Sequence, residues 1–217
     1  MKKDEELFRE LCLQIPRIKN ACENIKLSED ELKILLSFLR RFQNRKYKER
    51  IISQLRLYKK NYIASTLLDE FTSADIEDNS YRWNIAEALY TLNKPKYINE
   101  YNRIVCDKRY GKSRQMMVLL LGRIKSESSV PLLLSKMYEE DHDILPQVIY
   151  SIGKYKKAEL DIEVDRFAQN FFEPEKMKKT KNFLKIMKTS DKDYEYIDID
   201  GYIALIKKEV NNIRKRN

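Results

Sequence analysis

The chain is poor in histidine and glycine, and each shortage excludes a class of site. Its 217 residues include one histidine, so zinc sites built on two or three histidines are excluded. None of the four glycines is a close neighbour of another, which excludes a P-loop and the dinucleotide-binding fingerprint. No active-site motif replaces them. The composition therefore favours a binding protein over an enzyme, and we expect neither a cofactor nor a metal.

Long hydrophobic runs are missing as well. No apolar run approaches the roughly 18 residues of a membrane span, and the charged N-terminus is not followed by the apolar stretch of a signal peptide. Cys12, Cys22 and Cys106 are an odd number without metal-ligand spacing, which is typical of reduced, structural thiols. We therefore expect a cytoplasmic protein with no membrane partner.

The net charge of +9 suggests a nucleic-acid partner until its distribution is considered. Residues 1–50 and 173–217 each carry an excess of four positive charges, whereas residues 51–110 carry one and residues 111–172 none. A groove that binds duplex DNA would normally show a basic stripe through its centre. The distribution favours solubilising surface charge at the two ends of the chain.

Nearly the whole chain is predicted to be helical, because apolar residues recur at i, i+3, i+4 and i+7 without sustained alternation. Ser28 and Glu31 have the spacing of a capping box. Asp143 and Ser128 are predicted to cap two later helices, each of which has a proline in its first turn.

A unit of two helices recurs along the sequence. Its first helix is predicted at Glu49–Tyr58, Arg82–Leu92, Arg114–Ile124, Leu145–Tyr155 and again from near Thr180. Its second helix is predicted at Tyr62–Phe71, Tyr97–Cys106, Val130–Tyr138 and Leu160–Phe171. Equivalent apolar positions are 34, 32, 31 and 34 residues apart, at Leu55, Leu89, Leu121, Ile152 and Ile186. Such a pair cannot bury its apolar stripe alone, so stacking of the pairs into a solenoid is predicted.

The repeat spacing is shorter than the about 40–47 residues typical of HEAT repeats and closer to the tetratricopeptide period. The tetratricopeptide residue pattern fails, however, because its small-residue position falls on Leu134 and its aromatic position on Lys125. The ankyrin signature is absent. Leu121–Ile124 followed by Ser129–Leu134 instead resembles short bacterial HEAT-like repeats, in which Leu-Gly ends one helix and Val-Pro opens the next.

The resemblance extends to Leu67–Phe71, Tyr81–Leu89 and Arg109–Met116, which look like a family of small bacterial HEAT-repeat proteins without a general assigned activity. It covers about residues 45–190 and implies an all-α, right-handed HEAT-like α-α superhelix of about five helical pairs. We expect one domain, residues 1–217, with N-terminal capping helices at 1–45 and repeats at 46–190. Residues 191–217 would form a C-terminal capping helix and a basic tail.

Two candidate metal or catalytic features have simpler structural interpretations. His142 lies among acidic residues in a predicted turn, where we expect a solvated histidine. The acidic run Asp191, Asp193, Glu195, Asp198 and Asp200 precedes Gly201. A calcium loop aligned on this glycine would place Tyr196 and Lys207 at two essential ligand positions, so calcium is not expected. Asp198 or Asp200 is instead predicted to cap the final helix.

HEAT-like alkylpurine DNA glycosylases provide the alternative enzymatic hypothesis. Those proteins stack a damaged nucleotide on aromatic side chains and use a carboxylate to stabilise a cationic intermediate. Trp83, Ala86 and Tyr90 share one side of a predicted helix, which is typical of a packing face. Asn84 and Glu87 lie within a turn of Trp83, so the alternative stays open.

Further candidate positions are Lys112 and Arg114. They follow the turn at Gly111, where a helix N-terminus could hold an anion, although a turn glycine is the preferred interpretation. With Trp83, they would be the nucleic-acid contacts of the DNA-binding or DNA-repair alternative.

The preferred hypothesis is a non-catalytic scaffold that binds a protein partner through its concave face. In HEAT-like superhelices the second helices usually line that face. The candidate binding positions are Tyr62, Thr66, Asn99, Arg103 and Lys136. The family resemblance adds an adaptor or immunity-like role as a possible setting.

Overall fold

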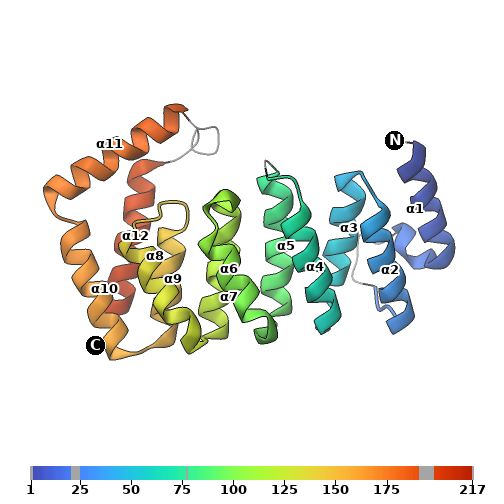
Figure 1. The fold of residues 1–217 in the computed structure, drawn as a ribbon, viewed down its shortest axis with the longest axis horizontal. Helices are drawn as coiled ribbons and strands as arrows, with labels where there is room; N and C mark the ends of the chain where they lie inside the picture. The colour runs from blue at the N-terminus through green and yellow to red at the C-terminus, as the bar shows by residue number, and fades with distance from the viewer. Residues whose placement is uncertain (1, 21–24, 77, 191–197, 217) are drawn as a thin grey trace. The chain divides into compact units, whose positions relative to one another are not determined.

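The computed structural model describes residues 2–20, 25–76, 78–190 and 198–216, and these residues are predominantly α-helical (Figure 1). No strand occurs within these ranges, which confirms the all-α prediction. Over the same part of the chain, no helix has both the length and the apolar character needed to cross a membrane.

The chain divides into two compact units, residues 1–120 and 121–217. The first contains α1 (Lys2–Gln14), α2 (Glu29–Arg41), α3 (Arg45–Leu55), α4 (Asn61–Ser73), α5 (Asn79–Leu92), α6 (Ile98–Cys106) and the start of α7 (Gln115–Ile124). It also contains the 3-10 helices η1 (Pro16–Asn20), η2 (Pro95–Tyr97) and η3 (Lys108–Arg114). α1 packs on α2, α2 on α3, and both α3 and α4 on α5, which in turn packs against η3.

The second unit contains the end of α7, η4 (Glu127–Ser129), α8 (Val130–Tyr138), α9 (Leu145–Tyr155), α10 (Ala158–Phe171), α11 (Pro174–Ser190) and α12 (Ile199–Arg214). α9 lies at its centre and packs against α8, α10 and α12. The final helix α12 therefore covers an apolar face of α9, while α11 contacts α10 and α12 (Figure 1).

Two predicted helix caps are confirmed. The Ser28 hydroxyl accepts a hydrogen bond from the Glu31 amide at 3.2 Å, and the Ser28 amide donates to the Glu31 carboxylate at 2.7 Å. Asp198 caps α12 by accepting from the Gly201 amide at 3.0 Å. Each carboxylate or hydroxyl satisfies a backbone N–H that has no partner inside the helix.

The predictions for Asp143 and Ser128 are wrong, because backbone carbonyls take the place of side-chain caps. Ile144 directly precedes α9, and the carbonyl of Asp141 accepts from the amides of Ile144 and Leu145 at 3.0 and 2.8 Å. Ser128 lies inside η4, and this 3-10 turn leads into α8 without a side-chain cap. The prolines do lie in the first turns of both helices, as predicted.

Four of the five equivalent apolar positions are buried, namely Leu55, Leu89, Leu121 and Ile152. The fifth, Ile186, is 64% exposed, so its assignment to the core is wrong. α11 begins at Pro174, earlier than the predicted start near Thr180, and its buried face runs instead through Thr180 and Leu184.

Gly122 allows α7 and α9 to approach closely within the second unit. A Cβ atom added at Gly122 would lie 2.6 Å from the Cβ of Ser151 and 2.7 Å from its Cα. Real Cβ atoms do not approach this closely, and one of the obstructing atoms is backbone. The helix must therefore have glycine at this position.

We expect Gly122→Ala to destabilise the protein by about 1–3 kcal/mol, because the methyl group forces α7 away from α9. Denaturant unfolding of both proteins measures the difference. Adding Ser151→Gly removes the side-chain part of the clash and should restore part of the loss. Full stability of the single variant would contradict the close approach.

Candidate functional site

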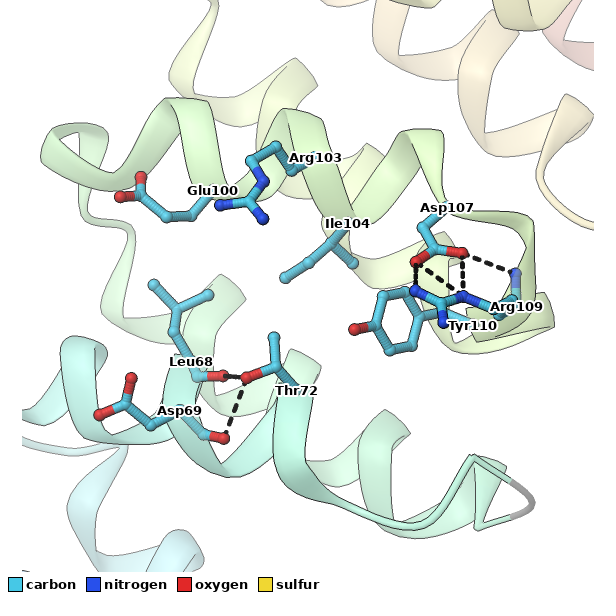
Figure 2. A pocket seen from close by; sticks show the side chains of 9 residues that line it. All are labelled: Leu68, Asp69, Thr72, Glu100, Arg103, Ile104, Asp107, Arg109 and Tyr110. Carbon is cyan, nitrogen blue, oxygen red and sulfur yellow. Dashed lines mark hydrogen bonds and ion pairs between the residues drawn. The ribbon is translucent and has the colours of Figure 1, made fainter.

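A pocket of about 390 Å³ opens between α4, α6 and η3 in the first unit (Figure 2). It is lined by Leu68, Asp69, Thr72, Glu100, Arg103, Ile104, Asp107, Arg109 and Tyr110. Leu68 and Ile104 are buried and form an apolar floor, while the charged residues surround them. We call this pocket the α4–α6 groove.

The hydroxyl groups of the groove differ in their availability. Thr72 donates to the carbonyl of Leu68 at 3.1 Å, so α4 itself uses that hydroxyl. The ring of Tyr110 packs 5.1 Å from that of Phe71, and its hydroxyl points into the groove (Figure 2). Tyr110 therefore offers a polar group on an aromatic side chain whose ring is held in place.

A buried arginine on α5 holds the segment that carries Tyr110. Arg82 is fully buried, and its guanidinium donates to the carbonyls of Asp75 and Ile76 and to the side-chain oxygen of Asn79. Its Nε donates to the Ser113 hydroxyl at 3.3 Å, and Ser113 donates in turn to the Tyr110 carbonyl at 2.5 Å. The guanidinium also lies 5.5 Å from the centre of the Tyr110 ring.

Arg114 fixes the same segment from its other end. It is fully buried, and it donates to the carbonyls of Gly111 and Val105 at 2.9 and 3.3 Å. Gly111 has a φ of +46°, a backbone conformation that side chains disfavour, which confirms the predicted turn glycine. The prediction of Arg114 as a nucleic-acid contact is wrong, because no part of its side chain faces solvent.

Arg82 and Arg114 are the structural residues that sequence reasoning missed. They are 32 residues apart and occupy the first position of two of the aligned repeat helices. This recurrence was a usable signal. Arginine at a helix start is usually a surface residue, and backbone carbonyl partners leave no pattern in the sequence, so neither helix taken alone predicts the burial of its arginine.

The charged residues of the groove differ in whether they form ion pairs. Arg109 binds Asp107 through two guanidinium nitrogens at 2.6–3.1 Å, and this contact holds the pKa of the Asp107 carboxyl below its usual range. Asp69 lies 3.8 Å from Arg40, in a loose exposed pair. Arg103 and Glu100 are exposed and form no ion pair within the described residues.

The groove therefore combines an apolar floor, the Tyr110 hydroxyl, and two charged side chains, Arg103 and Glu100, that form no ion pair within the described residues. The described residues contain no group of three or more His, Cys, Asp or Glu side chains placed to hold a metal ion. The arrangement is suited to binding a segment that carries an apolar side chain and a charge.

The predicted protein-binding residues do not all lie on one surface. Asn99 and Arg103 are exposed one turn apart on α6, and Arg103 lines the groove. Tyr62 is half-buried on α4, and Thr66 is only 8% exposed, with its hydroxyl donating to the carbonyl of Tyr62. Lys136 belongs to the second unit, is 6% exposed and pairs with Glu139 at 2.8 Å. Thr66 and Lys136 are thus packing positions.

The residues of the nucleic-acid alternative are similarly dispersed. Trp83 is 36% exposed, whereas Ala86 on the same side of α5 is buried, so Trp83 lies at the edge of the packing face. Asn84 donates to Glu49 at 2.8 Å, and Glu87 lies 3.4 Å from Arg56. These four residues, with Ile52 and Ser53, line a second pocket of about 230 Å³. Lys112 is half-buried.

The prediction of a solvated His142 is wrong. Its Nδ1 lies 3.0 Å from the hydroxyl of Tyr202 on α12, and its ring lies 5.2 Å from that of Phe183 on α11. Both helices fold back over the turn between α8 and α9 that carries the histidine. Burial lowers the pKa of His142, although Glu140, Asp141 and Asp143 partly oppose this effect.

Several predicted features lie outside the described residues. They are Cys22 and, from the acidic run, Asp191, Asp193, Glu195 and Tyr196. Of the other cysteines, Cys12 is half-buried, which raises the pKa of its thiol, and Cys106 is exposed.

No family model matches the chain, and searches of curated proteins and of solved structures also find no match. The HEAT-like resemblance remains an expectation from the sequence.

The packing of His142 predicts a pH-dependent stability. Because its pKa is lower in the folded protein than in the unfolded chain, the unfolded chain binds more protons as the pH falls through the unfolded value of about 6.5. The free energy of unfolding should therefore decrease in this range. Denaturant unfolding at several pH values measures the slope, and His142→Gln should flatten it. An unchanged slope in the variant would contradict the assignment.

We expect Arg82→Met to lower the free energy of unfolding by about 3–5 kcal/mol, because it removes every hydrogen bond of a fully buried guanidinium and leaves its acceptors without that donor. Arg82→Lys should recover little, since an ammonium group cannot reproduce the planar fork of donors. Arg109→Met, at a side chain that is 78% exposed, is the control and should change stability by less than about 0.5 kcal/mol. Equal effects at the two sites would refute the role of Arg82.

Proposed function

We propose that this protein is a non-catalytic scaffold, a right-handed HEAT-like α-α solenoid that binds a protein partner in the cytoplasm. Hydrogen bonds between elements one repeat apart support the solenoid. Within the first unit, Arg45 donates to Asp78, 33 residues later, at 2.8 Å. Asn84 donates to Glu49, 35 residues earlier, also at 2.8 Å. In the second unit, the Tyr155 hydroxyl donates to the carbonyl of Ser126 over 29 residues. Such nearest-neighbour contacts are what stacked repeats require.

The observation that carries the binding proposal is the α4–α6 groove, in which Arg103 is exposed and forms no ion pair within the described residues. Arginine and tyrosine are favoured anchors of protein interfaces, since each combines packing area with hydrogen bonding. Arg103 and Tyr110 line this groove together with the buried side chains of Leu68 and Ile104. A partner segment with an apolar side chain beside a carboxylate would fill the floor and pair with the guanidinium.

One observation favours the DNA-binding or glycosylase-like alternative. Trp83 is partly exposed on α5, the helix that also carries Asn84 and Glu87 into the second pocket. Asn84 donates to the Glu49 carboxylate, and the Glu87 carboxylate pairs with Arg56. Both carboxylates in this pocket therefore already have partners, which argues against a catalytic role. We therefore keep the protein-binding scaffold as the first proposal, with an adaptor or immunity-like role as its setting.

Affinity capture from a nuclease-treated lysate of the source cells tests the scaffold. We expect the wild-type chain to retain a protein and Arg103→Glu to bind that protein more than tenfold more weakly, because the substitution reverses the charge at the groove. Arg9→Glu is a matched control: Arg9 is exposed on α1 and forms no ion pair within the described residues. It should retain the partner.

Two outcomes would contradict the proposal. One is equal loss of the partner in both variants, which would indicate a general charge effect. The other is tight binding of duplex DNA whose logarithmic affinity falls with the logarithm of salt concentration, at a slope near −0.9 for each neutralised phosphate.

A further inference from the structure

Helix α11 presents apolar side chains to solvent at the periphery of the second unit. The helix lies at the edge of that unit (Figure 1). Its buried face packs through Thr180 and Leu184. Phe183 and Ile186 lie on another face and are 45% and 64% exposed. The Phe183 ring lies 5.2 Å from that of His142, so part of this side chain is covered, while the rest of it and most of Ile186 are open to solvent. Exposed apolar area of this kind next to positive charge is typical of an interaction surface.

The same helix is strongly basic. It carries six lysines and no arginine: Lys176, Lys178, Lys179, Lys181, Lys185 and Lys188. Lys176 pairs with Glu140 and Lys181 with Asp200. Lys178, Lys179 and Lys185 are exposed and form no ion pair within the described part of the chain.

Helical geometry places one of these lysines among the exposed apolar residues and the other two along a single edge of them. Lys179 is one turn before Phe183 and two turns before Ile186, so it shares their side of the helix. Lys178 and Lys185 are seven residues apart and form a row on the edge next to Ile186, about 140–160° around the helix from Phe183. We call Lys178, Lys179, Phe183, Lys185 and Ile186 the α11 patch.

We propose that the α11 patch binds the surface of an anionic lipid bilayer. The lysines would approach the headgroup phosphates, and Phe183 and Ile186 would enter the boundary of the acyl region. This association needs no spanning helix, only an amphipathic surface. It replaces the expectation of no membrane partner, which was based on the lack of long apolar runs. It is independent of the α4–α6 groove, so either proposal can fail without the other.

The composition of the patch favours lipid over a protein or nucleic-acid partner. Protein interfaces are enriched in arginine and depleted in lysine, whereas α11 has only lysine. Attraction to a layer of anionic headgroups needs no fixed hydrogen-bond geometry, so the point charge of a lysine is sufficient. A duplex backbone would leave Ile186 exposed, while the acyl boundary accommodates it.

Sedimentation of the full chain with vesicles tests the proposal. We expect binding to phosphatidylcholine vesicles that contain phosphatidylglycerol, weaker binding at high salt, and little binding to pure phosphatidylcholine. Each lysine near the surface contributes about fivefold to partitioning, so Lys178→Gln/Lys179→Gln/Lys185→Gln should bind roughly 100-fold more weakly. The control is Lys3→Gln/Lys46→Gln/Lys59→Gln, which removes the same charge from exposed lysines elsewhere. It should bind like the wild type.

Two isoleucine variants test the apolar contribution to vesicle binding. Ile186→Ser should weaken vesicle binding by roughly tenfold. Ile162→Ser should have no effect, since Ile162 is 58% exposed but lies on α10. Both substitutions remove an exposed isoleucine, so a general loss of stability would affect them alike, and circular dichroism checks that each variant is folded.

Three results would overturn the proposal. They are binding that does not depend on phosphatidylglycerol, equal losses in the two triple variants, and binding of duplex DNA or polyglutamate through the α11 lysines without vesicle binding. The last result would assign the patch to a different class of anionic partner.

Discussion

The buried guanidinium of Arg82 is the interaction on which the geometry of the groove depends. A charge removed from water is stable only if each of its donors finds an acceptor. Its named acceptors are the carbonyls of Asp75 and Ile76 before α5, the side chain of Asn79 at the start of α5, and the hydroxyl of Ser113 in η3. The side chain therefore joins the segment before α5 to η3, and the N–H donors of its planar fork hold the two together.

The hydrogen bonds of Arg82 also order η3, which forms one wall of the groove. Arg82 positions Ser113 and Tyr110, while Arg114 binds the carbonyl of Gly111 in the same short helix. A 3-10 helix of seven residues with a left-handed glycine inside it would otherwise be a mobile connection. Because two buried arginines hold it, the wall of the groove is already ordered before any partner arrives. Less conformational entropy is then lost on binding.

The sequence predicted features that depend on local pattern, and it failed where distant groups decide the outcome. The bounds of α8 and α9 match the prediction, and the buried Leu55, Leu89, Leu121 and Ile152 follow from the apolar spacing. His142 is different, because its environment comes from Tyr202, 60 residues later, and no local pattern reveals that contact. Arg114 was misjudged for a related reason: its acceptors are backbone carbonyls, which every residue possesses.

The groove was predicted only in part. Asn99 and Arg103 follow from their place on α6 off the apolar stripe, but Thr66 and Lys136 were assigned to the surface by the same rule and are buried. A helix that packs against neighbours on two sides buries a wider arc than one apolar stripe suggests. Polar residues at the border of the stripe are then covered, provided that a backbone carbonyl or a nearby carboxylate satisfies them, as happens for Thr66 and Lys136.

The lysines of α11 repel one another, and the ion pairs within the described residues offset only part of this repulsion. Lys181 and Lys185 are four residues apart, and Lys185 and Lys188 are three apart, so like charges face each other on one helix. Each such pair destabilises a helix by about 0.2–0.5 kcal/mol. Lys176 adds a positive charge to the first turn, where the helix dipole disfavours it. Acidic partners within the described residues relieve this repulsion at Lys176 and Lys181. Together with Lys181, Lys185 contributes to the positive charge that holds the pKa of the Asp200 carboxyl below its usual range. Lys178 and Lys179 form no ion pair within the described residues, and an anionic surface would relieve the repulsion among the three lysines Lys178, Lys179 and Lys185. The same surface would also cover Phe183 and Ile186, so a single occupant accounts for both the unrelieved charge and the exposed apolar area.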